Sequence, residues 1–258
     1  MRFGTFVFPV SQKPGNDHRI IHETLEEVQL CDKLGFDTAW LSEHHFDGAT
    51  AYVDPVVFAA SIASTTRKIR IGFAVVEMAL HHPVRLAAQT ALLDNLSNGR
   101  ILVGTGKGSA FNEYEYIGFG VPMEEAAESL QEAEDLILEA WKGKPVYFKG
   151  KYWDVAFPEL RPTPYQTPHP PLVRACLSED STREMARLHR PILIGAQDND
   201  SISKRINLYR QELESSQLSE EGIVSLLDKI WVSKNVFVAE TSSEALEIAQ
   251  IGLDTEQN

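Results

Sequence analysis

Three short segments of the sequence carry side chains and backbone suited to chemistry. Glu43-His44-His45 follows a strand-like run, the segment Gly104-Thr105-Gly106-Lys107-Gly108 is glycine-rich, and Ser178-Glu179-Asp180-Ser181-Thr182 precedes a helical pattern. Histidine suits general acid–base work because imidazole titrates near neutral pH. Glycines let the backbone approach a ligand closely, and the free N–H groups of a helix start attract anions. We therefore expect an acid–base group and a phosphate-binding turn.

Each segment also has a purely structural interpretation. Neighbouring histidines on an extended segment point to opposite sides, so His44 and His45 make poor joint metal ligands and can instead be hydrogen-bonded at a strand end. The sequence shows no further carboxylate or cysteine constellation beside them, and we predict no metal site. The glycine-rich segment can be a tight turn, and Ser178 to Thr182 is also a helix-capping signal.

The elements that would position these segments alternate between apolar strand-like runs and amphipathic helices, which is typical of βαβ units around a parallel sheet. The predicted strands are Arg2–Phe8, Thr38–Leu41, Ile69–Val76, Arg100–Thr105, Leu172–Ala175, Ile192–Gly195 and Ile230–Ala239. The predicted helices are Ile20–Leu34, Pro55–Thr65, one starting at Pro83, Thr182–Leu188, Ser203–Leu213 and Ser242–Leu253.

A parallel barrel explains this alternation better than an open doubly wound sheet. The doubly wound fold should place a glycine-rich turn after the first strand, and Phe8-Pro9-Val10-Ser11 has no glycine. We predict a TIM (β/α)8-type barrel in which functional groups gather at the carboxyl ends of the strands. It forms a single domain over residues 1–258, with seven strands, the last βα unit missing, and a gap between the first strand and the seventh. Either a longer chain continues past Asn258 or another element covers that gap.

A long insertion follows the fourth strand, over residues 109–170. It is expected to hold one helix at Met123–Trp141 and a hairpin of Val146–Phe148 and Tyr152–Asp154 around Gly150. Insertions of this length in compact domains tend to be functional or to cover a site.

Composition narrows the function classes. A net charge of −13 argues against a nucleic-acid surface or binding to an anionic membrane. No apolar stretch is long enough to span a bilayer, and the chain starts in strand-like residues without a signal-peptide core, so we expect a cytoplasmic protein. Cys31 and Cys176 give neither a disulfide framework nor a metal spacing.

Taken together, the segments resemble the bacterial-luciferase-like, flavin-dependent monooxygenases. The resemblance runs from Met1 to about Ala249 and is carried by the following stretches: Phe36-Asp37-Thr38-Ala39-Trp40-Leu41-Ser42-Glu43-His44-His45-Phe46, Ala74-Val75 followed by His82-Pro83-Val84-Arg85, Leu92-Leu93-Asp94-Asn95-Leu96-Ser97-Asn98-Gly99-Arg100, Lys149-Gly150-Lys151-Tyr152-Trp153 and Pro168-His169-Pro170-Pro171-Leu172. The Glu-His-His-Phe and Asp-Asn-Leu-Ser-Asn-Gly-Arg pieces are the most specific of these.

The resemblance implies roles for individual residues. His44 matches the active-site histidine near the reacting edge of the flavin. Ala74-Val75 matches a strand end that in relatives packs on the isoalloxazine through a cis peptide. The implied contacts on the phosphate side are the basic Lys107 with Glu43 close to it, Thr105 and Gly106 of the same turn, and Ser178, Glu179 and Thr182.

Two departures from the family pattern limit what the resemblance implies. Gly106 stands where the catalytic subunit of bacterial luciferase has a reactive cysteine, so light emission is not expected by default. The last βα unit of the luciferase barrel, with the mobile lid segment that precedes it, has no counterpart in these residues.

The implied activity is that of a two-component monooxygenase. Reduced FMN from a separate flavin reductase would react with O2, and oxygen would pass to a small organic substrate, an aldehyde or another apolar compound. The resemblance also implies a homodimer formed through the first helices. Two alternatives stay open: hydride transfer with the deazaflavin F420, and a non-catalytic flavin-binding protein or subunit. FMNH2 affinity and peroxide formation would separate the last of these from an enzyme.

Overall fold

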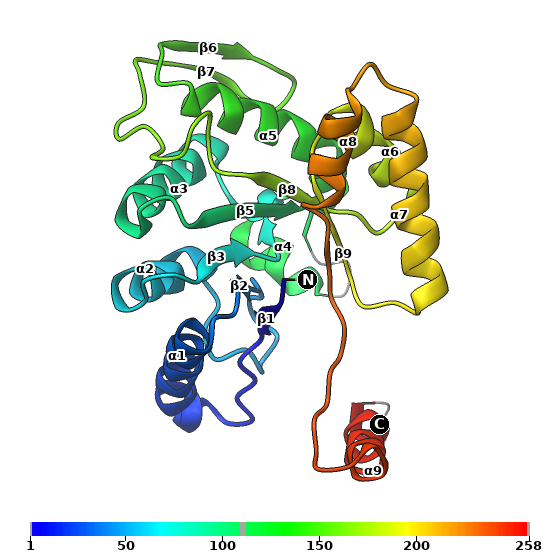
Figure 1. The fold of residues 1–258 in the computed structure, drawn as a ribbon. Helices are drawn as coiled ribbons and strands as arrows, with labels where there is room; N and C mark the ends of the chain where they lie inside the picture. The colour runs from blue at the N-terminus through cyan, green and yellow to red at the C-terminus, as the bar shows by residue number, and fades with distance from the viewer. Residues whose placement is uncertain (1, 109–111, 257–258) are drawn as a thin grey trace.

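The computed structural model describes residues 2–108 and 112–256. Its main feature is a curled parallel sheet with helices on the outside (Figure 1). The strands of this sheet, in spatial order, are β1 (Gly4–Val7), β2 (Thr38–Leu41), β3 (Arg70–Phe73), β5 (Ile101–Gly106), β8 (Leu172–Ala175), β9 (Ile192–Ile194) and β10 (Trp231–Val232). This order follows the chain, as in a TIM-barrel-like fold, and the prediction of seven core strands in a parallel barrel is confirmed.

The curled sheet is open between its first and last strands. Within the described residues no ladder joins β1 to β10, so the predicted gap is present. Side chains reach across it instead. Arg2 forms an ion pair of 3.0 Å with Asp228 and lies 5.6 Å from the centre of the Trp231 ring, and Trp231 meets Trp40 edge to face. The structure is therefore a TIM-barrel-like sheet whose seam is lined by aromatic and charged groups.

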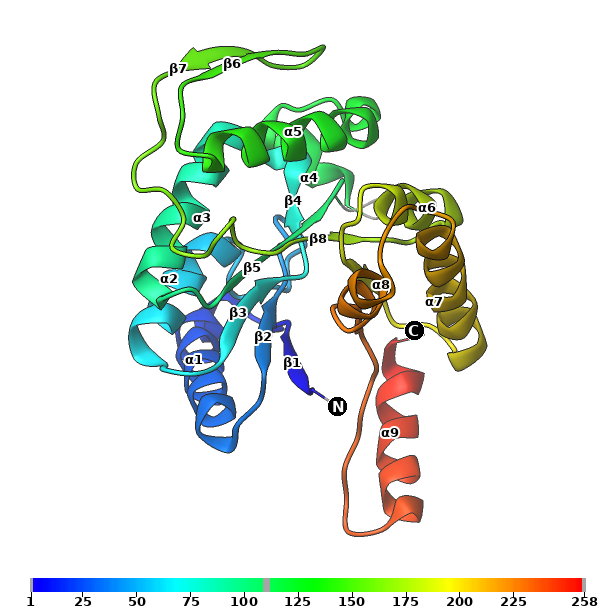
Figure 2. The ribbon, with the colours of Figure 1, turned by 45° about the horizontal axis from the view of Figure 1, so that its top comes forward.

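The predicted strand Ile69–Val76 is two strands. β3 ends at Phe73, the Ala74–Val75 peptide is cis, and β4 (Val76–Glu77) pairs with β5 alone. The prediction of a strand at Ile230–Ala239 is wrong in extent, because only Trp231 and Val232 pair, with β9. The segment 233–241 leaves the body as an extended arm that leads to α9 (Ser242–Glu256) (Figure 2).

The outer helices begin and end where local chemistry requires it. Asp54 caps α2 (Pro55–Thr65) by accepting hydrogen bonds from the N–H groups of Val56 and Val57. Gly35, at φ 85°, ends α1 (Asp17–Leu34) in the left-handed conformation that glycine adopts readily. The other helices on the sheet are α3 (Pro83–Ser97), α6 (Glu179–Arg187), α7 (Asn199–Glu214) and α8 (Glu220–Leu227), of which α8 was not predicted. No described helix is both long enough and apolar enough to cross a membrane.

The insertion after β5 holds more structure than expected. Residues 109–111 lie outside the described residues, and α4 (Glu113–Phe119), which follows them, was not predicted. Next come α5 (Ala126–Trp141) and the antiparallel hairpin of β6 (Val146–Lys149) and β7 (Asp154–Phe157), which Figure 1 shows at the top of the molecule. The helix and the hairpin were predicted, but the predicted second strand, Tyr152–Asp154, shares only Asp154 with β7.

A buried ion network attaches α5 to the sheet. Glu134 of α5 is fully buried and accepts hydrogen bonds from Thr105 of β5, Arg174 of β8 and Arg190. Removing one partner from such a network leaves a buried charge without compensation, which typically costs about 3–5 kcal/mol. The insertion is therefore anchored to the two strands whose ends carry the glycine-rich segment and the turn at Ser178.

Alternation along the strands separates two apolar layers. Trp40, Leu102, Val173 and Leu193 fill the interior of the curled sheet, whereas Ile101 and Val103 face the helices. Gly72 is required beside Trp40, since a Cβ at position 72 would lie 2.4 Å from the indole ring. The interior of the curled sheet is therefore a packed core, as in parallel barrels in general.

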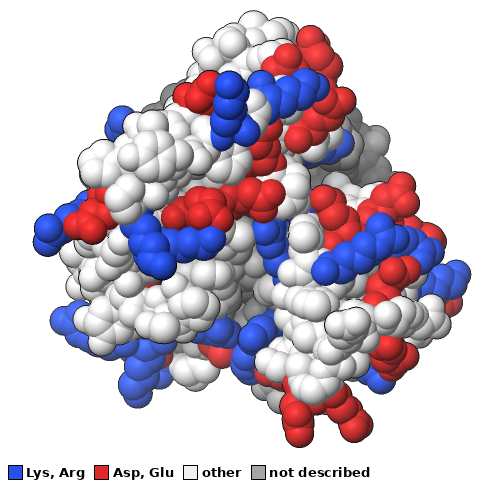
Figure 3. Space-filling view, turned by 90° about the horizontal axis from the view of Figure 1, so that it is seen from above, with Lys and Arg blue, Asp and Glu red and all other residues white. Residues whose placement is uncertain are grey.

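Acidic and basic side chains are interspersed on the face seen from above in Figure 3, which shows no broad basic patch. The same view shows a furrow between two halves of the molecule, with basic atoms inside it. A mixed surface of this kind suits a protein of net charge −13 and does not form the basic footprint typical of nucleic-acid binding.

Candidate active site

The Glu43 carboxylate organises the carboxyl end of β2. It is 3% exposed and accepts hydrogen bonds from the backbone N–H of Glu77 at 2.7 Å and from Nε2 of both His45 and His81 at 2.9 Å. Burial alone would raise the pKa of Glu43, but the hydrogen bonds from His45 and His81 outweigh it and lower that pKa. Burial opposes charging of His81, yet the hydrogen bond to Glu43 raises the pKa of His81.

His44 and His45 point to different partners, as predicted from their adjacency. The His45 ring bonds to Glu43, whereas His44 is partly exposed, with Nδ1 lying 3.7 Å from Oε1 of Glu115. The edge of the Phe8 ring meets the His44 ring at a centroid distance of 5.2 Å. Of the two histidines, His44 is thus the one that can meet a ligand at the strand ends.

Helix α4 holds the histidine segment from the other side. The backbone N–H of His45 donates to Glu115 Oε1 at 2.8 Å, and the Asn112 side chain donates to the His45 carbonyl at 2.6 Å. Glu115 is fully buried, and its Oε2 has no hydrogen-bond partner among residues 2–108 and 112–256. Leaving such an oxygen unsatisfied costs about 1–3 kcal/mol or more, which makes the position a candidate for function.

The sequence analysis missed Glu115, although one signal pointed to it. Asn112 is a helix N-cap residue, and its side chain accepts from the N–H of Tyr114. A cap followed by two alternating acidic residues, Glu113 and Glu115, could have revealed the short helix. Which of these two carboxylates turns inward is decided by packing alone.

Two carboxylates join His44, contrary to the expectation that none would. Ligand atoms of His44, Glu77 and Glu115 lie within 4.8 Å of one another. One imidazole and two carboxylates form a donor set that divalent cations can use. The expectation that no carboxylates lie beside the histidine is therefore wrong. The prediction of no bound metal is still to be tested by experiment.

The glycine-rich segment packs against the cis peptide. A Cβ on Gly106 would lie 2.7 Å from Val75 Cγ2, and one on Gly108 would lie 2.4 Å from the Tyr116 hydroxyl. The pairing of β4 with β5 places Glu77 opposite Gly106. These contacts bring the end of β5 next to Ala74–Val75 and the His44 cluster, and they explain why glycine stands at position 106.

Lys107 lies at the adjacent strand end. Since Thr105 pairs with Arg174, Lys107 comes beside the turn that leads from β8 into α6. It is exposed, and no ion pair of Lys107 is found within the part of the chain that the structure describes. The strand register therefore brings the predicted cation and the predicted helix start together.

The start of α6 confirms the capping signal. Ser178 accepts from the N–H of Ser181, and the Ser181 hydroxyl accepts from the N–H of Ser178. Arg205 of α7, which the sequence analysis did not single out, donates to the Leu177 carbonyl at 3.1 Å and to the hydroxyl of buried Thr182 at 3.3 Å. A helix start next to two cations is suited to an anion.

Two side chains that the sequence predicted to contact the cofactor have hydrogen-bond partners within the protein. The Thr105 hydroxyl donates to Glu134 of α5 at 2.6 Å. The Glu43 carboxylate is occupied by His45, His81 and the N–H of Glu77, which makes it a support for the site rather than a phosphate contact. Glu179 is exposed and paired with Arg183 at 3.4 Å.

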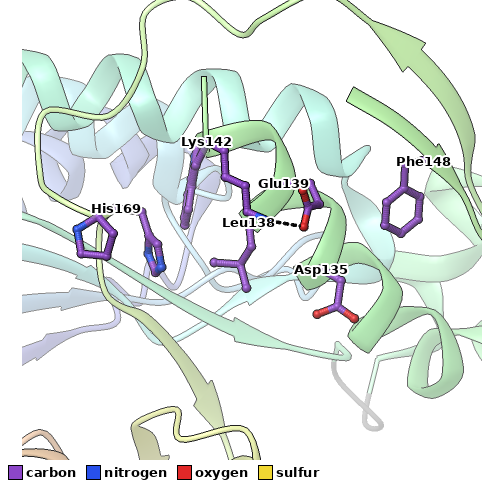
Figure 4. Close-up of a pocket in the computed structure, with 8 residues that line it drawn as sticks. Asp135, Leu138, Glu139, Lys142, Phe148 and His169 are labelled. Atoms are coloured by element: carbon purple, nitrogen blue, oxygen red, sulfur yellow. Dashed lines mark hydrogen bonds and ion pairs between the residues drawn. The ribbon is translucent and has the colours of Figure 1, made fainter. Parts of the chain in front are cut away.

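A separate pocket of about 510 Å³ lies between α5 and the β6–β7 hairpin (Figure 4). It contains Trp141, stacked on His169, and an ion pair of Lys142 with Glu139 at 2.5 Å. None of its lining residues belongs to the cluster at the strand ends, so the chemistry-bearing groups lie elsewhere.

Comparison with known proteins gives a consistent result. A family model described as luciferase-like monooxygenase matches residues 1–256. Limonene 1,2-monooxygenase of Rhodococcus erythropolis is 33% identical over 163 residues, which are 63% of this chain and 42% of that protein. The oxygenase component of flavin-dependent trigonelline monooxygenase from Acinetobacter baylyi is 27% identical over 256 residues, 96% of this chain and 69% of its own.

Solved structures show the same architecture. Monooxygenase RslO1 from Streptomyces bottropensis superposes with a TM-score of 0.85 at 28% identity, covering 98% of this chain and 77% of that one. The oxygenating constituent of 3,6-diketocamphane monooxygenase from Pseudomonas putida, solved with FMN, gives 0.81 at 21% identity, over 96% of this chain and 71% of that one. The chain spans about half the length of the first curated relatives it matches.

The Glu43–His81 pair predicts how stability depends on pH. The contribution of Glu43, whose pKa is lowered, is fully present above pH 4.5 and is lost as pH falls through its folded-state pKa. The contribution of His81, whose pKa is raised, is fully present below pH 6.5 and is lost as pH rises through its folded-state pKa. The pair therefore stabilises the fold most between these two values.

Glu43→Gln should lower the free energy of unfolding by about 3 kcal/mol at pH values inside this window, since it removes one charge of a buried pair. Urea unfolding followed by circular dichroism across the pH range measures this. Glu26→Gln, an exposed change on α1, is the control. Equal loss in both variants, or a Glu43→Gln effect that does not vary with pH, would show that the pair carries no such stabilisation.

Proposed function

The chain belongs to the luciferase-like monooxygenase family, and we propose that it uses reduced FMN and O2 to oxygenate a small apolar organic substrate. The observation that carries the proposal is the meeting of three features at the carboxyl ends of neighbouring strands. They are His44 after β2, Ala74–Val75 packed against Gly106, and Lys107 at the end of β5 next to the strand that leads into α6. Functional groups of parallel barrels gather at this end.

The residues present fit FMN. Ala74 and Val75 pack with the apolar interior cluster and lie against Gly106, where a side chain would fill the space beside them. They offer an apolar support of the kind a flat ring system needs. Lys107, Arg205 and the N–H groups at Ser178–Thr182 would hold the phosphate. When bound in reduced form, FMN supplies the electrons that activate O2.

The protein's own residues perform the remaining tasks. His44 would hold or move a proton at the ring nitrogen that faces the substrate, with Glu43 and α4 keeping its segment in place. Exposed aromatic side chains lie beside the histidine segment: Phe8 meets the His44 ring, and Phe46 and Phe119 pack on the His45 ring. This apolar rim supports a substrate of low polarity, and with the substrate in place it would keep water from the reacting atoms.

A flavin reductase is the proposed partner, supported by the name "oxygenase component" of the Acinetobacter baylyi relative. We also propose that the protein acts in the cytoplasm. The alternative of F420-dependent hydride transfer has solved neighbours of the same fold at 20–21% identity. Measuring the affinity for FMNH2 and for reduced F420 separates the two. If neither cofactor binds, both enzymatic proposals fail.

His44→Ala should lower turnover by about a hundredfold, the usual scale for losing a general acid–base group. FMN binding should survive, because His44 is not among the proposed phosphate contacts. The assay is oxygen uptake with FMN, a flavin reductase and a panel of aldehydes. His22→Ala, an exposed change on α1, is the control. Activity that a chelator abolishes and a metal restores would contradict an acid–base role.

Lys107→Ala should weaken binding of FMN far more than binding of riboflavin, since riboflavin has no phosphate. A charge-assisted hydrogen bond is worth roughly 1.5–3 kcal/mol, so a loss of about tenfold to a hundredfold is expected for FMN. Fluorescence titration of both flavins measures it, with exposed Lys144→Ala as the control. Equal weakening for both flavins would place Lys107 away from the phosphate.

We also propose a homodimer through the first helices. Leu30 and Leu34 of α1 and Val57 of α2 are 53%, 67% and 67% exposed, so two helices that contact each other offer apolar surface to a second copy. Light scattering at micromolar concentration should give a mass twice that of the chain. Val57→Glu should lower the measured mass to that of a single chain. Val224→Glu on α8 is the matched control. A monomeric parent protein would refute this proposal.

A further inference from the structure

The structure holds a buried carboxylate facing His44 that the family resemblance did not single out. Glu115 is fully buried, and its Oε1 lies 2.8 Å from the backbone nitrogen of His45 and 3.7 Å from Nδ1 of His44. The Oε1 atom thus accepts a hydrogen bond from the backbone of His45 and also faces the ring of His44. The second oxygen, Oε2, is buried without a hydrogen-bond partner in the described part of the chain.

We propose that Glu115 is a positioning residue for His44. Its carboxylate orients the imidazole through Nδ1 and supplies a counter-charge when the ring carries a second proton. The proposal rests on the proposed function, because it assigns Nε2, at the other side of the ring, to the reacting atoms. A carboxylate that holds one nitrogen of an imidazole while the other does chemistry is a recurring arrangement in enzymes.

The separation of 3.7 Å exceeds the usual hydrogen-bond range, which ends near about 3.2 Å for N–H···O. Catalytic hydrogen bonds are often long before the substrate binds and shorten in the complex. Glu115 is kept in place by the N–H of His45, whereas His44 is partly exposed and has room to turn. A small rotation of the imidazole is therefore the movement that closes the contact.

The groups facing His44 are mostly acidic. Glu115 comes from α4, Glu77 comes from β4, and Asp47 follows on the same loop as His44. Tyr116 of α4 lies beside Glu77 and Glu115. Burial, Glu77 and Glu115 together raise the pKa of Tyr116, so its hydroxyl stays neutral. Behind them, Glu43 is balanced by its hydrogen bonds with His45 and His81. Glu115 is thus one of several carboxylates near His44, and the test has to separate its effect from theirs.

Glu115 is better placed than Glu77 for this task. It sits in the first turn of α4, whose N-cap Asn112 also bonds to the His45 carbonyl, so the helix fixes both the carboxylate and the histidine backbone. The Glu77 segment is instead tied to Glu43 and β5.

The test compares Glu115→Gln with Glu113→Gln. Both replace a glutamate in the first turn of the same helix, but Glu113 is exposed. The first readout needs no turnover: ¹⁵N shifts of histidine in the flavin-free protein report the ratio of charged to neutral His44 at a given pH. Removing an opposite charge at this distance should lower that ratio by about tenfold in Glu115→Gln. Glu113→Gln should match the parent protein.

The second readout is steady-state kinetics with FMN, a reductase and a substrate that the parent protein oxygenates. Glu115→Gln should lower kcat about tenfold or more with KM nearly unchanged, and the alkaline limb of the kcat–pH profile should move to lower pH. Glu115→Asp keeps the charge and should recover part of both effects, and it serves as the test variant if Glu115→Gln does not fold.

Three results would overturn the proposal. One is a charged-to-neutral ratio of His44 that is the same in Glu115→Gln as in the parent protein. Another is a fall in kcat without any change in the pH profile, which would mark a purely structural role. The third is a stoichiometric Zn²⁺ or Mn²⁺ that binds the parent protein and is lost in Glu115→Gln, which would make Glu115 a metal ligand. A parent protein that shows no oxygenation of any substrate counts against the proposed function, while the ¹⁵N readout still tests the positioning of His44.

Discussion

The buried carboxylate of Glu43 is the interaction on which the site depends. A charge that is 3% exposed is stable only when its lone pairs are satisfied, and Glu43 meets this need with a backbone N–H and two imidazoles. These bonds join the end of β2 to β4 and to the 3-10 helix η2 (Met78–Leu80) that precedes His81. They also turn His45 inward. Because adjacent side chains diverge, His44 is left to face the opening.

The insertion completes what the strand ends begin. Its helix α5 is held through Glu134 by Arg174 and Arg190, so it is fixed to the same strands that carry Lys107 and the turn at Ser178. Helix α4, in the same insertion, reaches back to the histidine segment and contributes Glu115. The insertion is thus part of the site's construction, and the close approach of Gly106 to Val75 and of Gly108 to Tyr116 shows how little space separates these pieces.

Much of the fold could be predicted from the sequence. The bounds of β2, α2 and β8 agree with the structure, because each is a run of apolar residues bounded by clear start or stop signals such as Asp54-Pro55. The gap between the first and last strands was predicted from the number of strand-like runs, which is seven where a closed barrel has eight. The errors have physical reasons. Helices α4 and α8, of seven and eight residues, are too short to show a helical period. Most of Ile230–Ala239 has strand-like residues but finds no neighbouring strand to pair with.

The sequence by itself determined which chemistry is present: a histidine at a strand end, a glycine-rich edge with a lysine, a serine-capped helix start, and the family pattern that includes them. These signals are local, because caps, turns and strand ends depend on residues close together in the chain. Only the tertiary structure decided that Glu115, seventy positions from His45, is the carboxylate that meets the histidines. It also decided that Glu43 supports the site and that the Thr105 hydroxyl faces α5. The reason is that burial of a charge, and the partners that make burial tolerable, depend on which helix packs on which strand.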